Sequence, residues 1–217
     1  MIKNALVAGA TGLVGSNLIS LLIRNDYYNS IHVIVRKPYS LEHPKIHSHI
    51  LSFDKLSSFN PKALIRDVYV CLGTTLKKAG NVENFRKVDL HYVLELAKWA
   101  KENRVQRFSV ISSIGADKTK RNYYLYTKGE MEEELQRLGF DHLVILRPSL
   151  LLGERDEKRI AEKLGKYFMK VFSPLLFGNL RKYKPVKASD VANHMFIHTI
   201  NSDKRVSIVE NYQIPSY

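Results

Sequence analysis

The sequence predicts an α/β protein built on a doubly wound parallel sheet. Short apolar runs alternate with stretches in which apolar residues recur at helical spacing, which is typical of consecutive β-α-β units. The apolar runs are nearly continuous, as expected for parallel strands covered by helices on both faces. A glycine-rich turn joins the first run to the first helical stretch. Together these three observations indicate one sheet that organises the chain.

Length and composition favour a single domain. The chain has 217 residues, of which 45% are hydrophobic and 25% charged, as in ordinary globular proteins. No repeat, low-complexity stretch or linker divides it. We therefore predict one domain over residues 1–217, with residues 153–217 forming an appended lobe on the substrate side.

Each predicted element follows from its local hydrophobic pattern. Glycine at position 139 is the expected stop for the third helix. The predicted strands cover about residues 5–8, 31–35, 48–53, 68–72, 107–112, 142–146 and 206–209, and the predicted helices about 13–22, 83–102, 123–138 and 188–200.

Nothing in the sequence indicates an oxidising compartment or a membrane span. The single cysteine, Cys71, cannot form an internal disulfide. Residues 1–4 lead into the first strand without the features of a targeting segment. No apolar run approaches the ~18 residues that a transmembrane helix needs. The expected location is the cytoplasm.

The formal net charge of +13 favours anionic partners. Nucleotide phosphates, nucleic acid and an acidic membrane all fit, and so does a merely solvated surface. No basic and aromatic recognition motif accompanies the charge, so we expect no specific nucleic-acid partner. Residues 153–185 combine basic residues with apolar residues at helical spacing. This segment could lie peripherally on an acidic membrane, but we favour packing on the domain beside the substrate pocket.

The glycine-rich turn predicts a dinucleotide site. Gly9 suits a tight turn, Gly12 allows the backbone to approach a pyrophosphate, and Gly15 lets the helix sit close to the sheet. The free N–H groups at the start of the helix would then face the phosphates. The strand before this turn and the helix after it are the context that the motif requires.

The end of the second strand indicates which dinucleotide is bound. A site for NAD needs a carboxylate there for the ribose 2′-hydroxyl, whereas this chain has Arg36 and Lys37. Two cations favour a 2′-phosphate, which Arg can bind in bidentate fashion. The sequence therefore predicts NADP(H) as the cofactor.

Three residues predict a site for proton transfer. Tyr124 and Lys128 are four residues apart at the start of a predicted helix, so they share one face. An ammonium group beside a tyrosine stabilises the phenolate. Ser113 follows the fifth strand, where its hydroxyl could hold the oxygen of a substrate. These residues make a proton donor, its electrostatic partner and an orienting hydroxyl beside a hydride carrier.

Several segments resemble the short-chain dehydrogenase/reductase superfamily. More narrowly, they resemble its atypical branch, which contains the Tat-interacting-protein-type oxidoreductases and their bacterial relatives. The resemblance runs over nearly the whole chain. It rests on residues 9–15, 72–80, 85–89, 112–117, 124–128 and 146–155.

The resemblance implies a Rossmann fold that binds NADP(H) and carries a Ser-Tyr-Lys site at Ser113, Tyr124 and Lys128. Lys128 would also reach the nicotinamide ribose. The implied cofactor contacts are Gly9, Thr11, Gly12, Leu13 and Val14 at the pyrophosphate, Arg36 and Lys37 at the 2′-phosphate, Asp54 at the adenine amine, Gly73 and Thr74 beside the ribose, and Pro148 and Leu150 at the carboxamide.

The sequence departs from the larger extended members of the superfamily. They place an asparagine where this chain has Asp89, so their water-mediated proton relay is in doubt here. Their long C-terminal substrate domain is much reduced, which disfavours a sugar-nucleotide epimerase or dehydratase. Of the adjacent Tyr123 and Tyr124, only Tyr124 has a lysine four residues later.

The predicted function is NADPH-dependent reduction of a small carbonyl or enone substrate, with Tyr124 as proton donor. The alternative is a regulatory protein that binds NADPH with little or no turnover, because a fold does not fix a function. We expect no metal site: His194 and His198 have a spacing that can bind zinc, but no third ligand lies nearby.

Overall fold

A seven-stranded parallel sheet organises the described part of the chain. The computed structural model describes residues 3–153 and 184–214. The strand order is β3-β2-β1-β4-β5-β6-β9, and every neighbouring pair is parallel, which confirms the doubly wound α/β fold. The strands are β1 (Asn4–Ala8), β2 (Ser30–Val35), β3 (Ile46–Ile50), β4 (Asp67–Val70), β5 (Arg107–Ile111), β6 (His142–Arg147) and β9 (Val206–Glu210).

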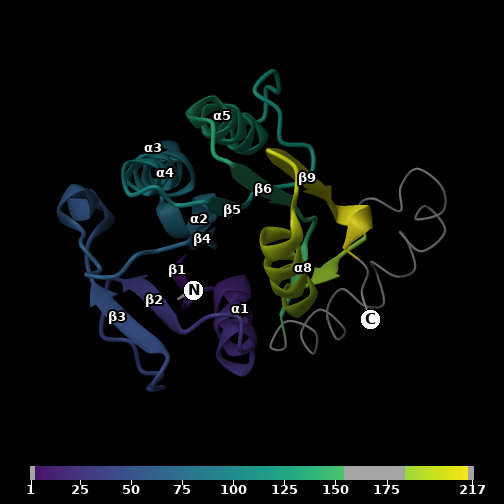
Figure 1. Cartoon of the computed structure of the whole chain (residues 1–217). Helices are drawn as coiled ribbons and strands as arrows, with labels where there is room; N and C mark the ends of the chain where they lie inside the picture. Colours follow the sequence, from purple (N-terminus) through teal and green to yellow (C-terminus); the bar gives the residue numbers. More distant parts are fainter. Residues whose placement is uncertain (1–2, 154–183, 215–217) are drawn as a thin grey trace.

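Helices cover both faces of the sheet (Figure 1). On one face α1 (Leu13–Arg24) packs against α8 (Ala188–Asn201), and on the other α4 (Tyr92–Glu102) lies beside α5 (Tyr123–Leu138). The neighbouring residues Leu6 and Val7 of β1 are both fully buried but belong to opposite core layers. Side chains alternate between the faces of a strand, so covering both faces requires the continuous apolar runs seen in the sequence.

Local sequence defines both ends of α5. The side chain of Asn122 accepts hydrogen bonds from the backbone N–H groups of Tyr124 and Leu125, which are otherwise unsatisfied at a helix start. Gly139 ends the helix in the left-handed conformation (φ 67°, ψ 54°). The predicted helix 123–138 and its glycine stop are confirmed.

The predicted third strand at 48–53 is wrong by several residues. β3 begins at Ile46 and is an edge strand of the described sheet, paired only with β2. Its residues are partly or fully exposed, which accommodates histidine and serine between the isoleucines. Ser52 caps the short 3₁₀ helix η1 (Phe53–Ser58) by accepting a hydrogen bond from the Asp54 N–H. The apolar residues at 51 and 53 therefore belong to a loop and a helical turn.

The predicted helix 83–102 is three segments. α3 (Val82–Arg86) is followed by a π turn, η2 (Lys87–His91), and then by α4. A short α2 (Leu76–Ala79) precedes them. A π turn contains more residues than an α turn, so the helical register changes at η2. The periodicity of apolar residues does not reveal such a change.

The described C-terminal residues continue the same fold. α8 and β9 confirm the predicted helix and strand, and β9 pairs with β6. The short strands β7 (Leu151–Leu152) and β8 (Val186–Lys187) form a second, two-stranded sheet, and η5 (Asn211–Gln213) follows β9. Most of the basic segment 153–185 lies outside the described residues, and the lobe boundary at 153 stays a prediction. Within the described ranges, no helix combines the length and apolarity that crossing a bilayer requires.

Three histidines stack on one face of β2 and β3. His32 is 4% exposed, and its Nδ1 lies 2.9 Å from Nε2 of His49. The His32 ring stacks on His47 and His49 with centroids 5.0 and 5.2 Å apart. Burial, followed by the charges of His49 and His47, lowers the pKa of His32 to about 4. The folded protein therefore holds His32 neutral.

This cluster predicts a loss of stability in mild acid. The unfolded chain protonates His32 near its ordinary pKa of about 6.5, whereas the folded chain does so only near 4. The stabilisation is complete above pH ~6.5 and is lost as the pH falls toward 4. We expect His32→Gln to remove about 2.5 kcal/mol of the decline in unfolding free energy between pH ~7 and ~4.5, measured by urea denaturation.

The control is His142→Gln, at a partly exposed histidine at the start of β6. This variant should show the same decline of unfolding free energy with falling pH as the wild type. Equal slopes in the wild type and His32→Gln would show that His32 does not cause the acid sensitivity.

Candidate functional site

The predicted site residues gather at the carboxyl ends of the parallel strands. The chain order reverses between β1 and β4, and ligands of open α/β sheets bind at such a switch point. The structure thus brings together residues from widely separated segments. Gly9, Thr11, Gly12, Leu13 and Val14 follow β1, Arg36 and Lys37 follow β2, Gly73 and Thr74 follow β4, Ser113 follows β5, and Pro148 and Leu150 follow β6.

The turn after β1 requires glycine. Gly9 has φ +85°, and a Cβ there would lie 2.5 Å from the carbonyl oxygen of Cys71. A Cβ on Gly15 would clash with the backbone of Gly9, so α1 packs tightly on the turn. α1 begins after Gly12 without a side-chain cap. Its first N–H groups, beside the exposed Thr11, are therefore suited to bind an anion.

Two exposed cations stand where the second strand ends. Arg36 and Lys37 follow Val35 directly, and both are exposed. Asp54 lies farther on, in the first turn of η1, and its side chain is about half exposed. No acid occupies the position after Val35 at which an NAD site has its carboxylate.

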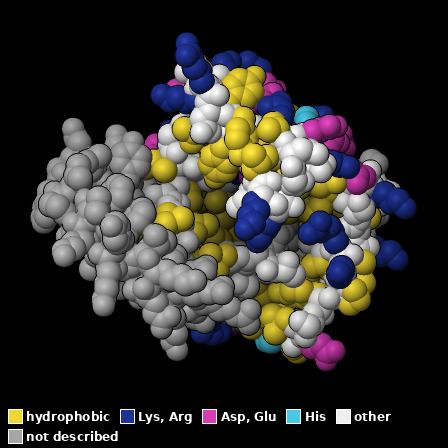
Figure 2. All heavy atoms as spheres, turned by 180° about the vertical axis from the view of Figure 1, so that it is seen from behind, with side chains coloured by type: hydrophobic (Ala, Val, Ile, Leu, Met, Phe, Trp, Pro, Cys, Tyr) yellow, Lys and Arg dark blue, Asp and Glu magenta, His cyan; other side chains and the backbone are white. Residues whose placement is uncertain are grey.

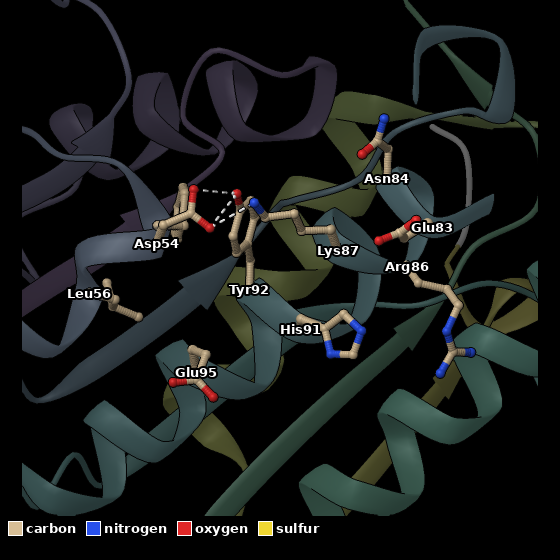
Figure 3. Close-up of a pocket in the computed structure, with 10 residues that line it drawn as sticks. Asp54, Leu56, Glu83, Asn84, Arg86, Lys87, His91, Tyr92 and Glu95 are labelled. Atoms are coloured by element: carbon tan, nitrogen blue, oxygen red, sulfur yellow. Dashed lines mark hydrogen bonds and ion pairs between the residues drawn. The ribbon is translucent and has the colours of Figure 1, made fainter. Parts of the chain in front are cut away.

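Asp54 borders a polar cavity of about 630 Å³ between η1 and the α3-η2-α4 segment (Figure 3). Lys87 Nζ lies 2.8 Å from Asp54 Oδ1, and the Tyr92 hydroxyl donates to the same carboxylate. The hydrogen bond from Lys87, with smaller contributions from Tyr92 and Ser52, holds the pKa of Asp54 below its ordinary value. The carboxylate therefore stays ionised, already bound to three side chains, those of Lys87, Tyr92 and Ser52. Its contact with an adenine amine remains a prediction.

Tyr124 and Ser113 lie on neighbouring elements. Tyr124 is the second residue of α5 and is partly buried, with its ring 5.5 Å from that of Phe85. Ser113 is 8% exposed, and its Oγ donates a 3.3 Å hydrogen bond to the carbonyl oxygen of Ile114. Both residues occupy the positions expected from the sequence.

Lys128 has a buried partner that the sequence reasoning missed. Its Nζ lies 2.7 Å from Asp89 Oδ1, and both side chains are almost completely buried. The same ammonium donates to the carbonyl oxygen of Ile111 at 3.3 Å. The other oxygen of Asp89 accepts a 2.8 Å hydrogen bond from the Thr74 N–H. Asp89 thus joins two predicted site residues.

A second buried charge holds α5 one turn later. Glu132 is 2% exposed and accepts hydrogen bonds from Ser112 and Arg147. Arg147 also pairs with Glu210 of β9 at 2.9 Å. The hydrogen bond to Glu132 is the main cause that raises the pKa of Arg147 above its ordinary value. The network connects α5, β5, β6 and β9.

Comparison with known proteins identifies the family. The model of the NAD dependent epimerase/dehydratase family matches residues 5–204. The chain belongs to that family. Protein FMP52, mitochondrial, of Candida albicans is 37% identical over 195 residues, which cover 85% of this chain and 82% of the relative. Protein HTATIP2 of Rattus norvegicus is 35% identical over 170 residues, covering 76% and 70%.

A solved structure shows the same fold. The Bordetella bronchiseptica enzyme WbmH in complex with NAD⁺ superposes with a TM-score of 0.70 at 15% identity, covering 95% of this chain and 75% of that one. The predicted resemblance to short-chain dehydrogenases/reductases and Tat-interacting-protein-type relatives is confirmed. The family supports a nucleotide-binding role of the oxidoreductase type.

The expected cytoplasmic location is wrong by the same comparison. The fungal relatives from Candida, Debaryomyces and Emericella carry names that place them in mitochondria. The expectation rested on the missing targeting features at residues 1–4 and on the lack of an apolar membrane span in the sequence.

The two missed acids left a detectable trace in the sequence. Asp89 stands next to Leu90, and Glu132 next to Met131, among residues that helix periodicity assigns to the buried faces. A charged residue on such a face requires a buried partner. Lys128, four residues before Glu132, is a third such residue.

The histidine pair on α8 forms no metal centre with its neighbours in the described structure. The rings of His194 and His198 stack with centroids 5.8 Å apart, and burial is the main cause that lowers the pKa of each. Over residues 3–153 and 184–214, no group of three or more His, Cys, Asp or Glu side chains is placed to hold a metal ion.

The network around Glu132 predicts a large loss of stability on its removal. We expect Glu132→Gln to lower the unfolding free energy by about 3 kcal/mol, because Arg147 would lose a buried ionic partner. The Tm should fall by roughly 6–12 °C in calorimetry. Glu134→Gln is the control, since Glu134 forms an exposed pair with Arg137, worth about 0–1 kcal/mol. Equal Tm losses in both variants would contradict the assignment.

Proposed function

We propose that this protein is an NADP(H)-dependent oxidoreductase that reduces a carbonyl or conjugated enone, with Tyr124 as proton donor. The observation that carries the proposal is the position of α5. This helix presents Tyr124 and, one turn later, the buried Lys128 beside β5, whose end leads into Ser113. Serine, tyrosine and lysine in this arrangement suit proton transfer to a substrate oxygen.

The turn after β1 supports the cofactor part of the proposal. The backbone fits a pyrophosphate, because Gly9 and Gly15 bring the uncapped start of α1 close to the strand end. Arg36 and Lys37 supply charge for a 2′-phosphate one strand away. Thr74, which follows β4, and the chain after β6 would border the nicotinamide half. When bound, NADPH supplies the hydride.

The chain's own residues supply the proton and the orientation. The hydroxyl of Ser113 would accept or donate a hydrogen bond to hold the substrate oxygen. Tyr124 would transfer its phenolic proton to that oxygen as hydride reaches the carbon, so that a carbonyl becomes an alcohol. Lys128 would stabilise the phenolate that Tyr124 leaves behind.

The expected partner is a small molecule. On the face shown in Figure 2, Lys and Arg side chains are scattered among hydrophobic and uncharged groups. Nucleic-acid binding sites usually gather such charges along one stripe or groove. No such stripe is visible among the coloured side chains of this face.

A second candidate is a regulatory protein that binds NADPH without turnover. The observation that favours it is that Ser113 and Lys128 are bonded within the protein, to Ile114, Asp89 and Ile111. Side chains whose hydrogen bonds are made within the protein can bind the ribose of a cofactor without acting on a substrate. The two candidates differ in whether Tyr124 is needed for anything measurable.

The cofactor proposal predicts tighter binding of NADPH than of NADH in calorimetric titration. Arg36→Ala should weaken NADPH binding by roughly 10–100-fold and leave NADH nearly unchanged, because a charged hydrogen bond to the 2′-phosphate is lost. Arg24→Ala, an exposed arginine at the far end of α1, is the control. Tighter NADH binding, or an unchanged preference in Arg36→Ala, would contradict NADP specificity.

The proton-donor proposal predicts that Tyr124→Phe lowers kcat by ~10²–10⁴-fold while NADPH affinity is nearly unchanged. An active substrate would first be found by measuring NADPH consumption over aldehydes, ketones, quinones and enones. Tyr123→Phe, the adjacent tyrosine, should keep most of the activity. Turnover that survives Tyr124→Phe would exclude Tyr124 as the donor, and NADPH binding without turnover on any compound would favour the regulatory candidate.

A further inference from the structure

Asp89 is a buried acid at the centre of the site. Its side chain is 1% exposed and that of Lys128 is 3% exposed. One carboxylate oxygen lies 2.7 Å from Lys128 Nζ, and the other accepts the Thr74 N–H at 2.8 Å. Burying two charges costs several kcal/mol each unless they are well paired and fully hydrogen-bonded. Such a pair indicates a specific requirement at this position.

The backbone around Asp89 is also unusual. Asp89 is the middle residue of the π turn η2 (Lys87–His91) between α3 and α4. π turns are rare and often occur at functional sites. The turn directs Asp89 inward, while its neighbour Lys87 reaches out to Asp54 at the surface.

The two contacts of Asp89 require a carboxylate. Both of its oxygens accept hydrogen bonds, one from an ammonium and one from a backbone N–H. An asparagine amide of the same size offers only one accepting atom, and its NH₂ group donates. Asparagine at position 89 would place its NH₂ group against either the Lys128 ammonium or the Thr74 N–H, so that two donors would face each other.

The partners of Asp89 belong to the nicotinamide side of the proposed site. Thr74 follows β4, Ile111 ends β5, and Lys128 lies on α5. Within the described structure, Asp89 and Ile111 take two of the three N–H donors of Lys128. The third remains for a ribose hydroxyl.

We propose that Asp89 is a positioning residue that fixes Lys128 and the backbone at Thr74 against the nicotinamide-side ribose. The proposal rests on the proposed NADP(H) function. Asp89 does not touch the cofactor itself. It acts by neutralising the buried ammonium and by fixing its direction together with the end of β4.

The test compares NADPH with adenosine 2′,5′-bisphosphate, which contains the adenine ribose and its 2′-phosphate but no nicotinamide ribose. We expect Asp89→Asn to raise the Kd of NADPH by about 10–100-fold, as for a lost charged hydrogen bond. The Kd of the bisphosphate should change by less than about 3-fold, because this ligand lacks the ribose that Lys128 and Thr74 would contact. Calorimetric titration gives both values, and circular dichroism checks that each variant is folded.

The control is Asp26→Asn, which makes the same chemical change at a fully exposed acid and should alter neither Kd. Equal losses for both ligands in Asp89→Asn would show a merely structural role and overturn the inference. Unchanged values for both would overturn it as well. A wild-type protein that binds neither ligand would instead refute the proposed function.

A measurement on the wild type keeps the inference testable if Asp89→Asn does not fold. NADPH should shift the NMR signals of the Thr74 amide and the Lys128 side chain, and the bisphosphate should leave both in place. Signals that respond equally to the two ligands, or to neither, would overturn the assignment of these groups to the nicotinamide side.

Discussion

Helix α5 is fixed to the sheet by two buried charges that lie one turn apart. Lys128 pairs with Asp89, and Glu132 pairs with Arg147. Leaving one member of a buried pair alone costs about 3–5 kcal/mol, so α5 can neither rotate nor slide without a large loss of stability. Tyr124, one turn before Lys128, therefore has a fixed place at the carboxyl edge of the sheet.

The partners of these charges come from several elements. Asp89 belongs to η2, Arg147 ends β6, and Glu210 ends β9. The position of α5 consequently depends on strand pairing from β4 to β9 and on the π turn before α4. By contrast, the turn after β1 depends on close approach of backbone segments. A Cβ on Gly9 would meet the backbone of Cys71 and Leu72 beyond β4, and one on Gly15 would meet the backbone of Gly9 and Ala10. The two halves of the site are thus stabilised by different physical means.

This difference explains how much the sequence could predict. The strand pattern was readable because adjacent residues such as Leu6 and Val7 both face a core. The glycine turn was readable because its three glycines stand close together in the sequence, between a strand and a helix. β3 was misplaced because it is partly exposed and carries two histidines and a serine instead of a continuous apolar run. Asp89 was noticed only as a departure from related sequences, since its pairing with Lys128 spans 39 positions and depends on the register of the π turn.

The charge distribution also bears on the kind of chemistry that the site suits. Within the buried region, Lys128 is balanced by Asp89, and Arg147 by Glu132 and Glu210. The exposed Arg36 and Lys37 stand instead at the end of β2, on the other side of the switch point. An electrostatic field of this form draws the anionic half of a dinucleotide to the surface cations. One turn after Tyr124, the charge of Lys128 is balanced by that of Asp89. This balance suits an uncharged carbonyl or enone, because such a substrate gains its negative charge only as hydride arrives.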